Sequence, residues 1–185
     1  GMVGDSTFFH SGVTGLMDIV YNRGLATVIV VDNRTTAMTG HQDHPGTGRT
    51  LMGEPTSSIK VQDLARACGM KRVYTLNPYD VTEAKRVLKE ALAAGEPSLI
   101  VSEAPCPLCT RARVGAVRHI DRTKCQACGA CLRLGCPAIW AGAEDIPDIQ
   151  ENLCNGCGLC EQVCKFDSIA PVAEGAGDGK TFQGY

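Results

Sequence analysis

Eight cysteines in the second half of the chain fall into two runs whose spacing suits iron–sulfur chemistry. Cys125, Cys128 and Cys131 follow the pattern C-x2-C-x2-C, and the same triplet recurs between residues 154 and 160. Three thiolates at two-residue intervals can wrap one cubane, whose fourth iron then needs a cysteine from elsewhere. Structural zinc usually takes two separated C-x2-C pairs, so zinc would leave a surplus thiolate in each run, and disulfides fit less well still. The spacing therefore predicts iron–sulfur clusters.

Each triplet is followed by a fourth cysteine, which in the bacterial two-cluster arrangement ligates the other cluster. The first predicted [4Fe–4S] cluster is held by Cys125, Cys128, Cys131 and Cys164. The second is held by Cys136, Cys154, Cys157 and Cys160. A four-residue gap before Cys136 and the absence of a proline after Cys164 depart from the common run. Residues 119–171 nevertheless resemble bacterial-type ferredoxins, a small α+β fold with two clusters.

Three further cysteines stand outside these runs. Cys106 and Cys109 form a C-x2-C pattern, which could be a redox pair or half of a metal site, but the sequence offers no second pair to complete it. Cys68 lies on an apolar helical face. We expect all three to be buried or incidental thiols.

An acidic residue and an amide in the first half could share a metal ion. Gly4 to Asn33 spans thirty residues, and Asp5 and Asn33 each come where a predicted strand gives way to a loop. Oxygen ligands of this kind suit a hard divalent cation, which often bridges to phosphates. The residues are equally compatible with a strand-end aspartate followed by a turn-forming Asp32-Asn33 pair.

The sequence around these residues is more specific. The runs GDSTFFHSG at 4–12 and DNRTTAMTGHQ at 32–42, continued by HPGTG at 44–48, resemble thiamine diphosphate-dependent 2-oxoacid:ferredoxin oxidoreductases. The likeness is greatest to the large (alpha) subunit of the indolepyruvate-type members. It covers essentially the whole chain, because that subunit ends with a diphosphate-binding domain followed by a two-cluster module.

The resemblance implies a set of cofactor ligands. Asp5 and Asn33 would bind Mg²⁺ through their side chains, and Thr35 through its backbone carbonyl. The residues that would let the backbone approach the thiamine diphosphate closely are Gly4, Ser6 and Gly40. The candidates for catalytic roles over the thiazolium ring are His10, His41 and His44. Each histidine is equally compatible with a loop residue that fixes its own backbone.

The resemblance also implies a reaction and partners. A 2-oxoacid, by likeness an arylpyruvate such as indolepyruvate, would be decarboxylated oxidatively to a coenzyme A thioester, and the electrons would pass through both clusters to an external ferredoxin. Two alternatives remain: an oxidoreductase for another 2-oxoacid, and a non-catalytic electron-transfer or assembly protein that keeps the fold.

One element of that chemistry has no counterpart in the sequence. The glutamate that activates the cofactor belongs to a pyrimidine-binding domain, upstream in the family, and neither Glu54 nor Glu103 has a matching motif. Family members also recruit a smaller second subunit. Because Gly1-Met2 leads at once into the Gly-Asp motif, we expect a fragment, or one piece of a larger assembly, that is inactive alone.

The elements that must position these residues follow from apolar periodicity. Predicted helices pass through residues 16–20, 61–68 and 84–92, the last beginning with a capping box at Asp80 and Glu83. Predicted strands cover 26–31, 72–76 and 98–102, and the first is expected to be buried on both faces. Alternating strands and helices predict an α/β fold with a parallel sheet and flanking helices, which binds ligands at the carboxyl ends of its strands.

Composition sets domain limits and excludes some partners. We expect a thiamine diphosphate- and Mg²⁺-binding domain truncated at its N-terminus (1–104), a linker (105–118), a cluster module (119–171) and a glycine-rich tail (172–185).

A net charge of −2 without a basic run gives no electrostatic support for binding to nucleic acid or to an anionic membrane. No apolar run approaches the roughly 18 residues of a membrane span. With no secretory signal, and with eight of the eleven cysteines clustered as for metal binding, we expect a cytoplasmic protein.

Overall fold

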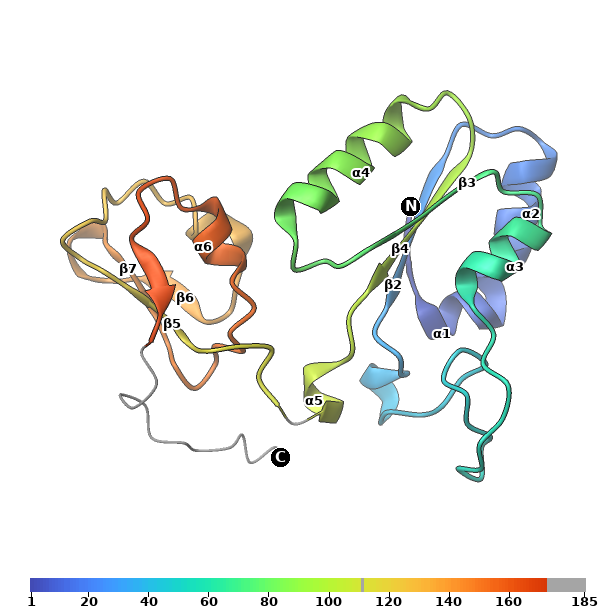
Figure 1. The fold of residues 1–185 in the computed structure, drawn as a ribbon, viewed down its shortest axis with the longest axis horizontal. Coiled ribbons are helices and arrows are strands. Elements are labelled where there is room, and N and C mark those ends of the chain that lie inside the picture. The colour runs from blue at the N-terminus through green and yellow to red at the C-terminus, as the bar shows by residue number, and fades with distance from the viewer. Residues whose placement is uncertain (111, 173–185) are drawn as a thin grey trace. The chain divides into compact units, whose positions relative to one another are not determined.

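The computed structural model describes residues 1–110 and 112–172, and the chain divides into two compact units (Figure 1). The first unit is Gly1–Cys109 and the second is Thr110–Tyr185. Residues 105–109, expected to belong to a linker, fold with the first unit. The expected tail lies outside the described residues except for Val172.

A four-stranded parallel sheet of order β1-β2-β4-β3 forms the first unit. Its strands are β1 (Met2–Gly4), β2 (Thr27–Asp32), β3 (Arg72–Leu76) and β4 (Ser98–Glu103). The strands predicted at 26–31, 72–76 and 98–102 are confirmed as β2, β3 and β4, and the two apolar runs, β2 and β4, lie at the centre of the sheet. Register pairs Gly4 with Val31, so the chain leaves β1 and β2 at the same edge of the sheet.

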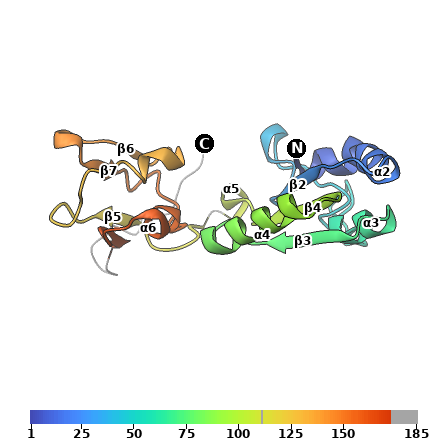
Figure 2. The same ribbon diagram turned by 90° about the horizontal axis from the view of Figure 1, so that it is seen from above.

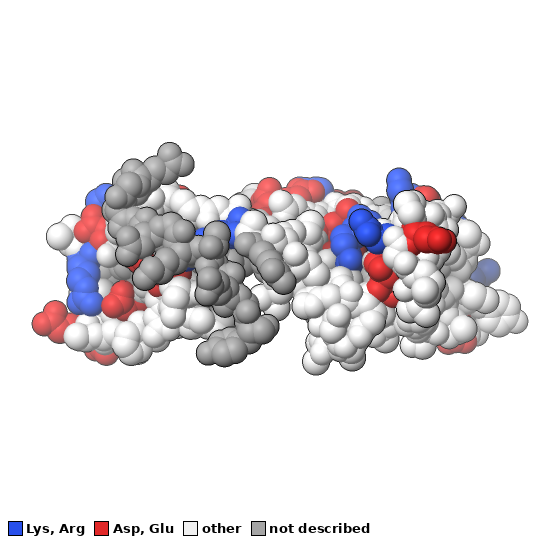
Figure 3. Space-filling model, turned by 90° about the horizontal axis from the view of Figure 1, so that it is seen from below, with Lys and Arg blue, Asp and Glu red and all other residues white. Residues whose placement is uncertain are grey.

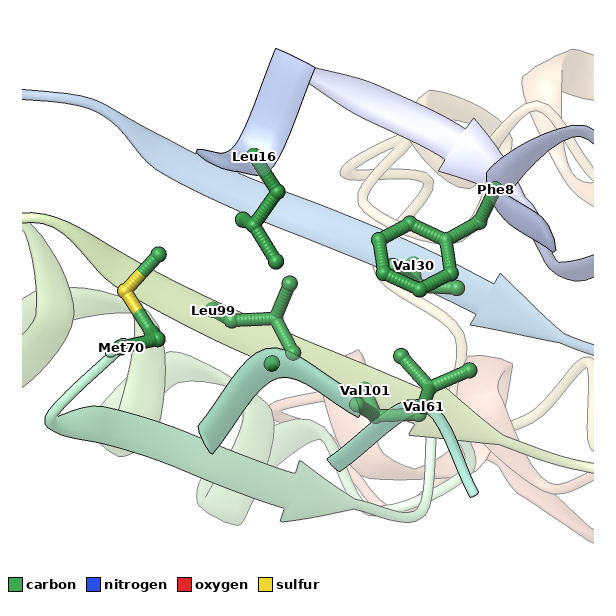
Figure 4. Packing of buried hydrophobic residues seen from close by; sticks show 8 residues of the cluster. Phe8, Leu16, Val30, Val61, Met70, Leu99 and Val101 are labelled. Carbon is green, nitrogen blue, oxygen red and sulfur yellow. The ribbon is translucent and has the colours of Figure 1, made fainter. Parts of the chain in front are cut away.

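Helices cover both faces of this sheet (Figures 1 and 2). On one face α2 (Val13–Tyr21) and α3 (Val61–Ala67) pack over the inward side chains of β2 and β4. Figure 4 shows this core: Phe8, Leu16, Val30, Val61, Met70, Leu99 and Val101. On the other face α4 (Val81–Ala93) buries Val87 and Ala91 against Ile100. The α/β class with flanking helices is confirmed.

The strand predicted at residues 26–31, which is β2, was expected to be buried on both faces. This expectation is wrong at the carboxyl end of the strand. Ile29 packs beneath α4, but Val31, two residues along the same face, is 38% exposed. Successive residues alternate between faces, so the cover that α4 provides reaches Ile29 and not Val31. The α4 boundaries agree with the sequence: Asp80 caps the helix by accepting the Glu83 N–H at 2.9 Å, and Gly95 follows it with φ +64°.

One helical run follows β1 directly and contains a π-helical turn that the sequence did not predict. It consists of α1 (Asp5–Thr7), the π turn (Phe8–Gly12) and α2. The turn places Phe8 in the core and Phe9 against the buried His44 ring, with centroids 5.4 Å apart. Such turns are rare and occur often at functional sites.

The second unit is a small α+β fold. Strand β5 (Arg118–Ile120) pairs antiparallel with β8 (Ile169–Pro171), and β6 (Ile139–Ala141) pairs antiparallel with β7 (Pro147–Ile149). Helix α6 (Leu159–Val163) and 3₁₀ turns at Leu132–Leu134 and Ala143–Asp145 complete it. Its core consists of Ala138, Ile139, Ile149 and Ile169 together with Cys131 and Cys160. This confirms the expected ferredoxin-like fold class.

Two chain segments of the second unit cross closely at a pair of glycines. Gly156 has φ +77°, and a Cβ there would collide with the carbonyl oxygens of Gly115 and Ala116. The Val114 N–H donates to the Asn155 carbonyl at 2.7 Å beside this crossing. Only glycine fits position 156 without moving the backbone.

The described helices include none with the length and apolar character needed to cross a bilayer.

Candidate functional site

The Asp5 carboxylate lies buried where β1 meets α1 and accepts three hydrogen bonds. Its Oδ1 accepts the Ser6 N–H at 2.8 Å, and its Oδ2 accepts the Arg34 N–H at 2.9 Å. The third donor is Nε2 of His44, also buried, at 3.1 Å. A carboxylate has about four acceptor positions, so one remains for a further ligand.

A second buried carboxylate, Asp32, ends β2 beside Asp5. Its Oδ1 accepts the same Arg34 N–H at 3.0 Å, so one amide lies between two acidic groups. Burial raises the pKa of Asp32, and Asp5 adds to the increase, while Arg34 opposes it. Two desolvated carboxylates this close favour a cation nearby.

Asn33 and Thr35 follow in a tight turn. The Asn33 Oδ1 accepts the Thr35 N–H at 3.1 Å, and Thr35 is buried. Arg34 between them has φ +64°, and its N–H donates to both Asp5 and Asp32. The turn that the alternative interpretation expected at Asp32-Asn33 is thus present. It leaves a lone pair on the Asn33 amide oxygen, and this oxygen-only donor set fits a hard divalent cation such as Mg²⁺.

Gly4 precedes this site, and the protein itself gives no reason for a glycine there. Its φ of −74° and ψ of 157° suit any residue, and a Cβ would meet nothing within 4 Å. The open space lies at the N-terminus of the helical run, where backbone N–H groups attract phosphate. Gly40 differs, because its φ of +116° itself requires glycine. These features suit a ligand phosphate close to Gly4.

A hollow of about 320 Å³ adjoins Asp32 and Arg34 at the carboxyl ends of the strands. Its charged lining residues are Asp32, Arg34, Lys60, Asp63, Arg66 and Glu103. Figure 3 shows Lys and Arg side by side with Asp and Glu on this face of the first unit. Ligands of parallel α/β sheets bind at this edge.

The structure separates the three candidate histidines. His44 is buried, and its Nδ1 accepts the Gly46 N–H at 3.1 Å, so it fixes its own loop while holding Asp5. Gly46 allows this contact, since a Cβ there would collide with the Phe9 ring. His10 and His41 are exposed. His44 therefore has the positioning role that the alternative interpretation assigned to loop histidines.

In the second unit, a small cavity of about 20 Å³ is lined by all four cysteines of one predicted cluster. The cysteines that line it are Cys125, Cys128, Cys131 and Cys164. These are the four residues expected to hold the first cluster, and the last comes from the far end of the module. Cys136, Cys154 and Cys160 lie around the module's apolar core. Figure 1 shows the helix that carries Cys160, α6, within this unit.

The buried thiols of this unit are poorly suited to ionise alone. Burial raises the pKa of Cys160 to about 11, and Cys157 and Cys154 nearby add to the increase. Burial also raises the pKa of Cys131. Thiolates in this setting need a compensating positive charge, which cluster iron would supply.

Both halves of the chain match known protein families. The model of "Thiamine pyrophosphate enzyme, C-terminal TPP binding domain" matches residues 1–102, and "4Fe-4S binding domain" matches residues 147–170. The chain belongs to the thiamine pyrophosphate enzymes, and it also carries an iron–sulfur binding domain. The matched iron–sulfur segment includes the second cysteine triplet and Cys164.

Relatives that match this chain over both halves include proteins named indolepyruvate oxidoreductase subunit IorA. The chain is 39% identical to that of Methanothermobacter marburgensis over 170 residues, 91% of this chain and 27% of the relative. It is 39% identical to the Pyrococcus horikoshii protein over 184 residues (94% and 28%) and 36% identical to the Archaeoglobus fulgidus protein over 175 residues (92% and 28%). The chain thus spans about 28% of the length of these relatives.

Sequence reasoning missed two residues of the site. Asp32 was given only a turn-forming role, although an acid at the end of a strand, next to a predicted ligand, was a signal for it. Arg34 acts through its backbone N–H, which links Asp5 and Asp32. No sequence pattern reports that contact, because it depends on a positive φ at a non-glycine residue.

Proposed function

We propose that this chain is the diphosphate-binding and electron-transfer part of a 2-oxoacid:ferredoxin oxidoreductase. The observation that carries the proposal is the presence of a thiamine pyrophosphate-binding domain and a 4Fe–4S domain in one chain. A thiamine site joined to iron–sulfur centres favours oxidative over non-oxidative decarboxylation. The substrate we propose is an arylpyruvate such as indolepyruvate, following the names of the relatives, and the product is a coenzyme A thioester.

The residues of the first unit would hold the cofactor by its phosphates. Asp5 and Asn33 supply side-chain oxygens to Mg²⁺, and Thr35 supplies its carbonyl. Gly4 and the start of α1 leave room for the diphosphate. His44 keeps the Asp5 carboxylate in place from behind. Bound thiamine diphosphate supplies the electron sink for decarboxylation.

The second unit would carry the electrons away. Two [4Fe–4S] clusters, held by the two cysteine sets given above, pass one electron at a time to an external ferredoxin. The convergence of all four cysteines of the first set on one cavity supports that assignment, and this cavity of about 20 Å³ has to widen to admit a cubane.

The proposed catalytic unit is larger than this chain. We propose that a pyrimidine-binding domain supplies the activating glutamate, that a smaller subunit completes the site, and that the assembly works in the cytoplasm. The chain alone then binds the diphosphate end of the cofactor and the clusters without turnover.

Activity of the complete assembly tests the proposal. Arylpyruvate with coenzyme A should bleach the visible absorption of the clusters and reduce ferredoxin. The Asp5→Asn variant should lose bleaching by substrate but still bleach with dithionite, which reduces the clusters directly. If no 2-oxoacid bleaches the wild-type clusters while dithionite does, the chain serves electron transfer or assembly instead.

Iron content tests the clusters separately. Anaerobic protein should contain about eight irons per chain. The Cys136→Ala and Cys164→Ala variants should each lose about half of that iron and a different paramagnetic signal. Stoichiometric zinc in place of this iron would overturn the assignment.

A further inference from the structure

The first unit contains a second group of metal-binding side chains, made of softer atoms than the Asp5 site. One ligand atom each from His41, Cys106 and Cys109 lie within 4.8 Å of one another. Sequence reasoning treated both cysteines as buried or incidental, and Cys109 proves to be exposed. Cys106 is buried, and His41 is exposed.

Backbone contacts bring these distant residues together. Cys106 directly precedes the short helix α5 (Pro107–Thr110) and Cys109 lies within it, and the Cys109 N–H donates to the Cys106 carbonyl at 3.1 Å. The Cys106 N–H donates to the Asn33 carbonyl at 3.0 Å, which fixes this turn to the end of β2. The His41 N–H donates to the Thr36 carbonyl at 3.1 Å. The loop after β2 thus presents His41 to the cysteine pair.

We propose that His41, Cys106 and Cys109 form a zinc site with two thiolates, one imidazole and an open fourth position. Thiolate sulfur and imidazole nitrogen are the usual ligands of Zn²⁺, whereas Mg²⁺ prefers oxygen. The oxygen site at Asp5 and Asn33 and the sulfur–nitrogen site at His41 therefore suit different metals, although the loop after β2 contributes residues to both.

The geometry is within reach of a tetrahedral ion. Zinc–sulfur bonds of about 2.3 Å and zinc–nitrogen bonds of about 2.0 Å place ligand atoms roughly 3.5–3.8 Å apart. Atoms now within 4.8 Å of one another need to approach by about 1.0–1.3 Å at most. The exposed side chains of His41 and Cys109 have room for that movement.

Charge and proton balance also favour zinc. Binding releases one proton from each thiol to solvent, and the imidazole binds in its neutral form. Zinc with two thiolates and an imidazole has no net charge, so the site adds no charge beside the buried Asp5 and Asp32 carboxylates. Bound zinc would join His41 to a cysteine pair that lies 65 and 68 positions further along the chain.

The site does not depend on the proposed function, and its test needs no turnover. Zinc and iron are measured by elemental mass spectrometry in the full chain, purified anaerobically and loaded with its full iron. We expect about one zinc per chain in addition to the iron. Full iron occupancy matters because empty cluster cysteines also bind zinc.

Matched variants locate the metal. Cys109→Ser and His41→Ala should lose the zinc and keep the iron, whereas Cys68→Ser and His10→Ala should keep both. X-ray absorption at the zinc edge should show two sulfur ligands and one protein nitrogen. Iron-loaded protein without zinc, zinc unchanged in both ligand variants, or a Cys106–Cys109 disulfide in the anaerobic protein would each overturn the proposal.

Discussion

Replacing His44 tests whether this side chain holds the Asp5 carboxylate in place. The His44→Ala variant removes one of three donors to Asp5 and leaves the Gly46 N–H without its acceptor. A buried polar group without a partner costs about 1–3 kcal/mol. Loss of the stacking on Phe9 adds about 0.5–1.5 kcal/mol. Water entering the space offsets part of this, so we expect a loss of about 2–4 kcal/mol.

Thermal unfolding measures this loss. For a unit of 109 residues, each kcal/mol lowers Tm by about 4 °C, so the transition should fall by roughly 8–16 °C. Far-UV circular dichroism follows the helices, most of which belong to the first unit. The single tryptophan, Trp140, lies on β6 in the second unit, so its emission serves as an internal control and should not change.

Two further variants separate the hydrogen bonds from general damage. His44→Gln keeps a donor that can reach Asp5 and should recover part of the loss. His10→Ala removes an exposed histidine from the π turn and should leave Tm within about 2 °C of wild type. If His44→Ala melts as close to wild type as His10→Ala does, His44 does not position Asp5 in the way we argue.

Other contacts give sharper local tests, all measurable by denaturant or thermal unfolding and iron analysis. Asp80→Ala should cost about 1 kcal/mol through loss of the α4 cap, while Asn at this position should cost only a few tenths. Val87→Ala should lower the free energy of unfolding by about 2 kcal/mol because the Val87 side chain is buried. Leu88→Ala, at a partly exposed position, should lower it by less than about 1 kcal/mol. Equal losses in the two variants would contradict the packing of α4. Gly156→Ala should abolish iron retention because its Cβ collides with backbone, whereas Gly135→Ala, with a positive φ but open space, should keep its iron.

The sequence predicted those parts of the fold that depend on local patterns. The run Thr27–Asp32 is recognisable as a strand from its β-branched residues alone. Asp80 is recognisable as a helix cap because its hydrogen-bond partner, the Glu83 N–H, is only three positions away in the sequence. Three cysteines of the first predicted cluster, Cys125, Cys128 and Cys131, could be grouped by their spacing, and Cys164 could be added from the known two-cluster arrangement.

Contacts between distant residues could not be obtained in this way. His44 reaches Asp5 across 39 positions, and nothing in the pattern around either residue specifies the other. The exposure of Val31 depends on how far α4 extends over the sheet, which a single strand does not encode. The meeting of His41 with Cys109 required the course of a long loop that has no hydrophobic period.

The π turn at Phe8–Gly12 uses one more residue than an α-helical turn would use between Asp5 and α2. A π turn closes i→i+5 hydrogen bonds and an α turn closes i→i+4 bonds, so five residues of a π turn rotate the chain through about the same angle as four residues of an α turn, roughly 400°. Deleting one residue within Phe8–Gly12 and restoring α geometry would therefore leave α2 in nearly the same orientation, with Leu16 in the core and Asp5 still beside Arg34 and His44. The deletion would instead remove the widened turn, which packs Phe9 against the buried His44 ring. The length of this segment should thus matter for the support of His44 and not for the direction of α2.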